Sequence, residues 1–467
     1  MAGWDEARVK QLLPWLRAQK DRYVLVLETN PLVLFKKESY PQIEMAVFSP
    51  ENKEQIFESL AWKYLFLSFS YETINEHITF DEFIRIQSEV NYRASDFADH
   101  GVKLFKNIQS NLSSNFCLGE KLFGKFSKVP AIVCGAGPSL RKNGALLKEL
   151  TDKSLLLAGG GAVAALRKLG VDPHFEAHVD SDSAHPFSPT QTPTFFQLRT
   201  DEKVLSCAEG KKFLISGNGN FPFESWIEEQ LGLAISNFDG GWTVGTFALA
   251  LAYHLGCDPI ILVGMDFSAS QEHVYAEGVK GGGEISRQAV VGRGGETVYA
   301  QLDWILAAEW VEKFVKDHPD RTWINATEGG LGFKGVKEMA LKDIHLSPLK
   351  ENVRGITEAF SDVSTGHIRE IVEASLVRSY EIIQAIMKEI QANFPKPPLE
   401  SGMCALLEHD LSQEMSYQKI FLPIWDVWKS VILRHNQDGE NGAFLHKMLF
   451  CLNLYPLFQC QLHTIPK

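Results

Sequence analysis

Residues 131–139 read AIVCGAGPS, where a short apolar run ends in a glycine-rich turn. Gly135 and Gly137 permit a tight turn and let the backbone approach a ligand closely. Pro138 suits the first position of a helix, whose free N–H groups and positive dipole end attract an anion, and Ser139 adds a hydroxyl donor. The stretch therefore predicts a strand, a turn and a helix that together hold a phosphate. A tight turn that binds nothing is the alternative.

The turn does not match two common nucleotide motifs. No Gly-Lys-Ser/Thr follows it, so it is not a P-loop. Leu140 stands where a dinucleotide fingerprint has its third glycine, and the next strand ends in LLLAGGGA without the acid that holds a ribose hydroxyl. We therefore expect no NAD, and we expect no haem.

Small and polar residues follow each of the other predicted strands. In a doubly wound sheet, ligands lie beyond the carboxyl ends of the strands, so these residues are expected to meet at one polar site. The nucleotide-binding candidates are Gly135, Gly137, Ser139, Gly159, Gly160, Asn218, Asn237, Asp239, Gly240, Gly241, Thr243 and Asn325, and the catalytic candidates are Asp266, His273 and Glu328.

One predicted strand, FEAHVD, and the residues beside it suggest metals. Asp180 and Asp182 can hold a divalent ion such as Mg²⁺ against a diphosphate, or they can simply cap the next turn. His174, Glu176, His178 and Asp180 share one face of a strand by the period of two. Zinc is not expected there, because the spacing of the two histidines suits a helix and this run is not helical.

A glycine-rich segment at 268–296 contains His273, Tyr275, Arg287 and Arg293. Loops of this length without regular structure are uncommon unless they are functional, so we interpret it as a lid over a phosphorylated substrate. A disordered insertion is the alternative. His273 can act as a general acid or base near neutral pH, or it can be a surface histidine without a role.

The order of apolar runs predicts three regions. Residues 1–120 hold two strand-like runs, YVLVLE and IEMAVFS, and predict a small α/β domain. Residues 121–345 alternate strands with helical patterns, at 138–150, 161–169, 222–231, 243–256 and 298–317, and predict a Rossmann-like, mostly parallel sheet with helices on both faces. Residues 346–467 predict an all-helical region, which packs on the sheet domain or joins copies of the chain.

Composition limits the class of partner. The 467 residues carry a net charge of −12, which disfavours nucleic acid and anionic membranes. Seven scattered cysteines without a Cys-x-x-Cys pair indicate a reducing, cytoplasmic environment. The N-terminus lacks the apolar region of a signal peptide. The most apolar window, 244–263, contains His254 and Asp258 and predicts a buried helix and strand instead of a membrane span.

Taken together, the motifs VCGAGPSL, DGGWTVG, GMDFS, HVYAEG and INATEGGLGFKGV, in this order, resemble the bacterial motility accessory factor (Maf) family of flagellin glycosyltransferases. The likeness covers about 125–340, a domain shared with archaeal-type 6-hydroxymethylpterin diphosphokinases. The turn GAGPSL is also similar to the GNGPSL turn of bacterial sialyltransferases that use CMP-sialic acid, with Ala136 where those enzymes have Asn.

The resemblance implies transfer of a nonulosonic, sialic-acid-like sugar from a CMP-activated donor to a serine or threonine of a protein such as flagellin. It places the cytidine phosphate on Gly135, Gly137 and Ser139. It places Asp239–Thr243, Asp266 and Glu328 around the sugar and base. Two alternatives stay open: pyrophosphoryl transfer from ATP with Mg²⁺, and a non-catalytic nucleotide-binding or assembly protein.

Overall fold

The computed structural model describes residues 1–19, 22–36, 42–73, 80–182, 188–217, 221–233, 238–269, 275–276, 288–434 and 439–464. These residues form two compact units, each described here by itself. Unit 1 contains residues 1–101 and 375–457, and unit 2 contains residues 102–374 and 458–467. The N-terminal and C-terminal regions that the sequence analysis treated separately thus lie largely within one unit.

Unit 2 is built on a nine-stranded sheet in the order β13-β12-β9-β4-β5-β6-β7-β8-β3, in which every neighbouring pair is parallel. Its strands are β3 (Cys117–Leu118), β4 (Ala131–Cys134), β5 (Leu155–Gly159), β6 (Phe175–His178), β7 (Thr194–Phe196), β8 (Lys212–Leu214), β9 (Ile260–Val263), β12 (Trp323–Asn325) and β13 (Lys337–Glu338). A separate antiparallel hairpin pairs β10 (Gln288–Val291) with β11 (Thr297–Ala300).

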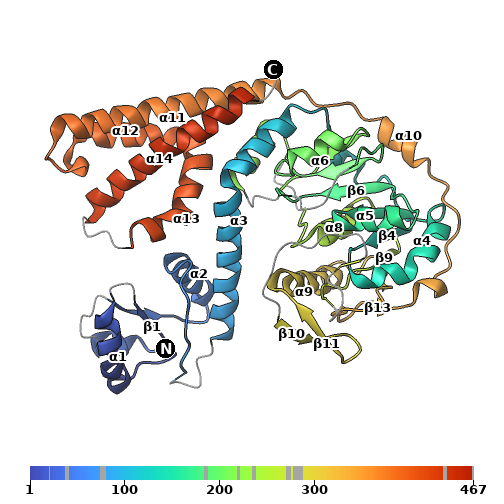
Figure 1. Cartoon of the computed structure of the whole chain (residues 1–467), viewed down its shortest axis with the longest axis horizontal. Coiled ribbons are helices and arrows are strands. Elements are labelled where there is room, and N and C mark those ends of the chain that lie inside the picture. The colour runs from blue at the N-terminus through green and yellow to red at the C-terminus, as the bar shows by residue number, and fades with distance from the viewer. Residues whose placement is uncertain are drawn as a thin grey trace. The chain divides into compact units, whose positions relative to one another are not determined.

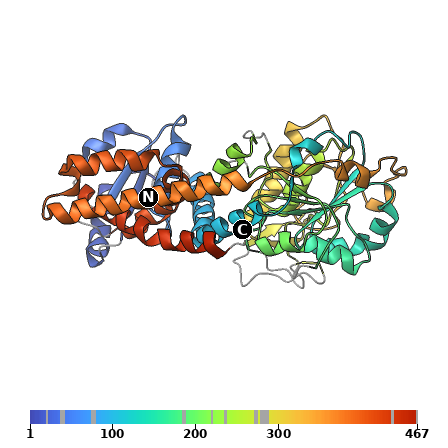
Figure 2. The same cartoon turned by 90° about the horizontal axis from the view of Figure 1, so that it is seen from above.

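Helices cover both faces of this sheet because its central strands are apolar on both sides. Ala131 and Val133 of β4 face one core, and Ile132 and Cys134 face the other. α8 (Val244–His254) and α9 (Leu302–Asp317) pack on the first face, and α4 (Gly144–Leu150) and α5 (Gly161–Lys168) pack on the second. Both helix layers are visible beside the strands (Figure 1; Figure 2). The remaining helical segments of unit 2 are η2 (Gly119–Leu122), η3 (Pro138–Asn143), α6 (Glu202–Cys207), α7 (Pro222–Gln230), η4 (Leu341–Asp343) and α10 (Val353–Glu358).

The predicted fold class is confirmed: a parallel α/β sheet, with an all-helical C-terminal region. Five of the described strands were not predicted: β3, β7, β10, β11 and β13. The segment read as one long lid ends in the β10–β11 hairpin, because the runs QAVV and TVYA flank a glycine-rich turn, which is a hairpin signal. β7 was not predicted, because the run TFF is only three residues long.

Unit 1 joins a small N-terminal α/β part to C-terminal helices. Its strands β1 (Val24–Glu28) and β2 (Ile43–Val47) pair in parallel. One apolar cluster contains Phe57, Phe83 and Val427. Phe57 and Val427 are 370 positions apart in the sequence, so the N-terminal and C-terminal regions share a core. Its helical segments are α1 (Glu6–Ala18), η1 (Pro31–Lys36), α2 (Lys53–Lys63), α3 (Asp81–Leu112), α11 (Gly366–Asn393), η5 (Pro398–Glu400), α12 (Gly402–Gln413), η6 (Tyr417–Phe421), α13 (Leu422–Ile432) and α14 (Gly439–Thr464), of which α3, α11 and α14 extend past the unit boundaries.

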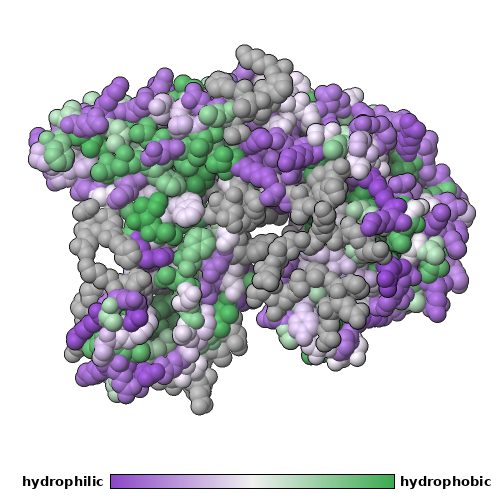
Figure 3. Space-filling model, in the orientation of Figure 1, coloured by the Kyte–Doolittle hydropathy of each residue, from purple (hydrophilic) through white to green (hydrophobic). Residues whose placement is uncertain are grey.

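The C-terminal helices of unit 1 expose apolar side chains. Phe394, Leu399, Met403 and Leu406 lie exposed near the end of α11 and on α12, and Figure 3 shows an apolar area over these helices. None of the described helices is both long and apolar enough to cross a bilayer. The expectation that this region joins copies of the chain stays a prediction.

Because α13 and α2 share a core in unit 1, we predict that a disruptive substitution in α13 also destabilises α2. Val427→Asp places a charge among buried apolar side chains, which is strongly destabilising. We expect faster amide hydrogen exchange in both α13 and α2, and unchanged exchange in β4 and β5 of unit 2. Lys429→Ala, on the exposed side of α13, is the matched control. Normal protection of α2 in the Val427→Asp protein would contradict a shared core.

Candidate functional site

The strand order reverses between β4 and β9. From β4 the chain adds β5, β6, β7 and β8 on one side, and it then returns to place β9 and β12 on the other. In open α/β sheets such a reversal leaves a crevice at the carboxyl ends of the two central strands, where ligands bind. The glycine-rich turn follows β4, and Asp266 follows β9, so both lie at this switch point.

Asp266 is the central side chain of this crevice. It is 4% exposed, and its Oδ2 accepts hydrogen bonds from the Ser139 hydroxyl at 2.8 Å and from the Ser139 backbone N–H at 3.4 Å. Burial raises the pKa of Asp266, although the hydrogen bonds from Ser139 and the positive charge of Lys142 act in the opposite direction. A buried carboxylate whose pKa is raised is a stronger base than an exposed one, which suits proton transfer.

Two glycines leave the space that this carboxylate occupies. A Cβ at Gly137 would overlap with Oδ2 of Asp266. Gly330, which follows β12, has φ +78° and lies so close to the backbone of Asp266 that a Cβ would overlap with its carbonyl. Only glycine satisfies both the conformation and the space at position 330. The glycines of GAGPS and TEGG therefore make room for Asp266.

Three amides of the glycine-rich turn already have partners. The N–H groups of Gly135 and Gly137 donate to the carbonyls of Val263 and Gly264, each at 2.8 Å, and that of Ser139 points to Asp266. Pro138 opens a 3-10 helix, η3, instead of a long α-helix. An anion at this turn therefore competes with the Asp266 carboxylate for Ser139.

The end of β12 completes the crevice. Thr327 Oγ accepts from the Met265 N–H at 3.1 Å, which ties the chain after β12 to the residue before Asp266. The predicted residue Asn325 is buried, and its side chain donates to Glu338 and accepts from the Thr327 N–H. Glu328 is exposed, and its carbonyl accepts from Lys142 Nζ at 2.9 Å. Lys142 is thus a cation beside Asp266 that the sequence analysis missed, although it lies only five residues beyond Gly137.

The start of α8 reaches the same edge. Gly159, at the end of β5, packs directly against Val244, and a Cβ at Gly245 would lie 3.0 Å from the sulfur of Met265. Thr243 caps the helix through reciprocal bonds with Thr246. Gly135 also packs against Met265. The ends of β4 and β9 and the start of α8 therefore meet around Met265, and the end of β5 joins them through Val244.

The residues just before α8 have structural partners. Asp239 Oδ1 accepts from the Gly241 N–H at 3.0 Å, and its Oδ2 accepts from the Trp310 indole at 2.7 Å. Gly240 packs on Phe247, and Gly241 packs against Thr246 and Trp310. Asp239 thus holds the turn against α9. Gly160, the N-cap of α5, has φ +52° and only Val244 near its Cβ position.

The predicted metal residues after β6 are exposed. Asp182 forms an ion pair with Lys103, and the Asp180 carbonyl accepts from the Asp201 N–H at 2.9 Å. Within the described ranges, no three His, Cys, Asp or Glu side chains gather as a metal site would need. On β6 itself, Glu176 bonds Arg167 at 2.5 Å and lies 3.4 Å from His178, while His174 accepts from the Leu156 N–H. The face considered for zinc is thus a local ion-pair network.

Three predicted residues lie outside the described residues: His273, Asn218 and Asn237. Arg287 of the predicted lid does so as well. The described part of that segment includes Tyr275 and Ala276. Tyr275 stacks edge-on against Trp304, and the Ala276 N–H donates to the Ala136 carbonyl at 2.9 Å. The segment after Asp266 therefore returns to the glycine-rich turn.

A second polar cluster, at the ends of β7 and β8, was missed entirely. Glu224 and Glu228 of α7 are 1% and 4% exposed. Glu228 accepts from the Ser216 hydroxyl and the Gly217 N–H, each at 2.7 Å, and Glu224 accepts from the Arg199 N–H at 3.2 Å. Burial and the neighbouring Glu224 raise the pKa of Glu228 to about 8, so the pair holds a proton at neutral pH. The sequence signal was the pair of glutamates one helical turn apart on the apolar face of PFESWIEEQ.

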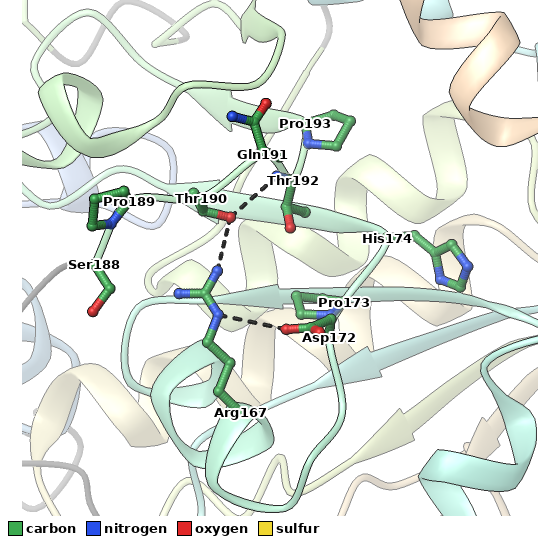
Figure 4. A pocket seen from close by; sticks show the side chains of 10 residues that line it. All are labelled: Arg167, Asp172, Pro173, His174, Ser188, Pro189, Thr190, Gln191, Thr192 and Pro193. Atoms are coloured by element: carbon green, nitrogen blue, oxygen red, sulfur yellow. Dashed lines mark hydrogen bonds and ion pairs between the residues drawn. The ribbon is translucent and has the colours of Figure 1, made fainter.

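A pocket of about 500 Å³ lies at the opposite, amino edge of the sheet (Figure 4). Residues 188–193 before β7 and 172–174 before β6 line it, together with Arg167 at the end of α5. The Arg167 guanidinium is bonded to Glu176 and Thr190. Because its one cation is already neutralised and it faces away from the switch point, this pocket is not part of the candidate site.

The buried proton of Glu228 predicts a pH-dependent stability. A folded-state pKa of about 8, above the usual 4.5, means that stability is lost as the pH rises from about 4.5 to about 8. Glu228→Gln keeps an acceptor for the Gly217 N–H and a donor for Ser216. We expect a gain in unfolding free energy of roughly 2 kcal/mol at pH 8 and almost none at pH 4, measured by urea denaturation. Glu229→Gln, exposed on the same helix, is the control. An equal gain at both pH values would show that Glu228 carries no buried proton.

Comparison with known proteins supports the architecture described above. Residues 103–272 match the family model described as 6-hydroxymethylpterin diphosphokinase MptE-like. No curated protein matches the chain. The solved structure of a Maf glycosyltransferase from Magnetospirillum magneticum AMB-1 matches with a TM-score of 0.53 at 12% identity, over 97% of this chain and 78% of that one. Residues 103–272 are therefore similar to the MptE-like family, and the chain has the fold of a Maf glycosyltransferase, which confirms the resemblance predicted from the sequence.

Proposed function

We propose that the protein is a glycosyltransferase that moves a nonulosonic sugar from a CMP-activated donor to a serine or threonine of a protein. The observation that carries the proposal is the buried Asp266 carboxylate, bonded to Ser139 at the switch point of the sheet. The likeness in fold to a Maf glycosyltransferase supports this class of reaction.

The transfer needs a base and a cation. The bond between the anomeric carbon and the phosphate oxygen breaks, the acceptor oxygen bonds to that carbon, and CMP leaves with the electron pair. Asp266 takes the hydroxyl proton of the acceptor, since its raised pKa suits a base and Ser139 fixes the orientation of its carboxylate. Lys142 stabilises the charge on the departing phosphate, and Glu328, exposed beside it, borders the sugar. A flagellin-like protein is the acceptor that we propose.

A second function is favoured by one observation, the match of residues 103–272 to an MptE-like family model. Pyrophosphoryl transfer from ATP would need Mg²⁺ held by carboxylates close to the phosphates. Asp180 and Asp182 are the candidates for this role, and both are exposed. The two functions differ in the nucleotide that binds, which makes them easy to separate.

Asp266→Asn should abolish turnover and leave the fold intact. Asparagine keeps the acceptor for Ser139 and removes only the basic oxygen, so the melting temperature should change by no more than about 2 °C. CMP release from CMP-sialic acid and other CMP-nonulosonic acids, in the presence of a serine- and threonine-rich acceptor protein, should fall at least about 100-fold. Asp258→Asn, at the amino edge where Asp258 accepts from the Thr322 N–H, is the control. Full activity in the Asp266→Asn protein would remove Asp266 from the site.

Lys142→Met should weaken CMP binding. Removing the cation beside the crevice is expected to reduce the CMP-induced rise in melting temperature by half or more, because binding to the native state raises stability by mass action. Lys148→Met, on the exposed face of α4, should leave this rise unchanged. Stabilisation by ATP with Mg²⁺, and none by CMP, would replace the proposed function with the second one.

A further inference from the structure

One edge of the β10–β11 hairpin has no partner among the described residues. β10 pairs with β11 in the register Gln288↔Ala300, Ala289↔Tyr299, Val290↔Val298 and Val291↔Thr297. No other described strand pairs with β10. Figure 1 shows the hairpin projecting from the sheet domain beside α9. Within the described part of the chain, the outer side of β10 is therefore an open sheet edge.

The hydrogen-bond pattern identifies which groups face outward. The Gly292 N–H donates to the Glu296 carbonyl, so this pair is hydrogen-bonded, and the pairs alternate along an antiparallel ladder. Val291 and Ala289 thus turn their N–H and C=O groups away from β11. Tyr299, opposite Ala289, confirms this alternation, because its own N–H and C=O bond to Ala269 on the other side. Two donors and two acceptors are presented along the edge.

This edge lacks the usual protection. Exposed edge strands in natural proteins commonly carry a lysine, a proline or a bulge that prevents another strand from adding. The sequence QAVV has none of these, and Val291 is 75% exposed. Val290 points the other way, against the cluster of Ala269, Ala300 and Trp304. An uncharged edge of this kind is a template for strand addition.

The hairpin is attached to the candidate site at both ends. Ala269, three residues after Asp266, pairs with Tyr299 of β11. At the tip, the Arg293 N–H donates to the Gly330 carbonyl at 2.9 Å, and its guanidinium bonds the Thr327 carbonyl and Glu338. Gly330 itself lies against Asp266. A strand on β10 would therefore be held by an element that is fixed to the crevice.

We propose that the free edge of β10 binds the acceptor polypeptide as an added, extended strand. The inference rests on the proposed function, since it assigns the surface that receives the acceptor. Backbone pairing suits an acceptor chosen for exposed serine or threonine, because the main chain supplies the affinity and alternate side chains project to either side. A segment paired in this way presents its hydroxyl side chains in extended form beside the crevice.

A second copy of the chain fits this edge less well. A stable dimer buries about 800 Å² on each partner, and a strand of four residues is about 13 Å long, which is too little by itself. Each copy also carries a net charge of −12, which opposes self-association. A short edge favours a transient complex with a peptide.

The test measures peptide binding without a sugar donor, so it is independent of turnover. The probe is a fluorescein-labelled octapeptide of alternating valine and threonine, titrated into the full-length protein and followed by anisotropy. We expect saturable binding with a dissociation constant on the order of 1 mM or tighter. Val291→Pro removes one outward N–H without removing a β10–β11 bond, and should weaken binding at least about fivefold. Val291→Thr keeps the N–H and should bind like the wild type.

Two controls decide the result. The same peptide N-methylated at every residue has no N–H on either edge and should not bind. Unchanged melting temperature and CMP binding in the Val291→Pro protein show that the hairpin and the crevice are intact. Equal binding by the Val291→Pro protein, or no binding by the wild type, overturns the proposal. If the wild-type protein sediments as a dimer and the Val291→Pro protein sediments as a monomer, the edge binds a second copy of the chain instead. Peptide binding without CMP binding would support strand addition at β10 and contradict the proposed function.

Discussion

The contact between the Asp266 carboxylate and Ser139 constrains the middle of the sheet domain. A carboxylate that is 4% exposed needs donors, and the hydroxyl and N–H of Ser139 supply them. To reach Ser139, the chain after β9 must lie against the turn after β4, which leaves no space for a Cβ at Gly137. The parallel order of β4 and β9 brings these two turns together, so the topology and the buried charge depend on each other.

The same contact limits how the crevice can work. Three of its backbone donors bind the carbonyls of Val263 and Gly264 and the side chain of Asp266, so these three are already engaged. A ligand anion must displace the carboxylate from Ser139 or lie beside it, near Lys142. In the second arrangement the proposed base, Asp266, and the proposed cation, Lys142, lie on adjacent sides of the anion. Transfer of a sugar between a hydroxyl and a phosphate needs both groups.

Much of this was predictable from the sequence, because buried parallel strands are short apolar runs that end in small or polar residues. AIVCG, FEAHVD and PIILVG could be read in this way, and with them the positions of Gly137 and Asp266. The side-chain partners could not be predicted. Asn325 and Asp239 look like ligand residues in the sequence, yet they bond Glu338 and Trp310, which are 13 and 71 residues away. Glu224 and Glu228 look like an ordinary amphipathic face, and only the packing of Gly217 and Arg199 shows that they are buried.

The two halves of the carboxyl edge have different physical roles. After β6 and β7, the buried side chains Asn107 and Asn111 of α3 bond four backbone carbonyls, and Glu228 holds the turn after β8. In that half, these buried side chains hold the backbone of the turns in place. After β4, β9 and β12, exposed side chains such as Lys142 and Glu328 surround one buried carboxylate, and the hairpin anchored there has an open edge. The buried carboxylate with an exposed cation beside it is found on the second half, which is where we place the proposed site.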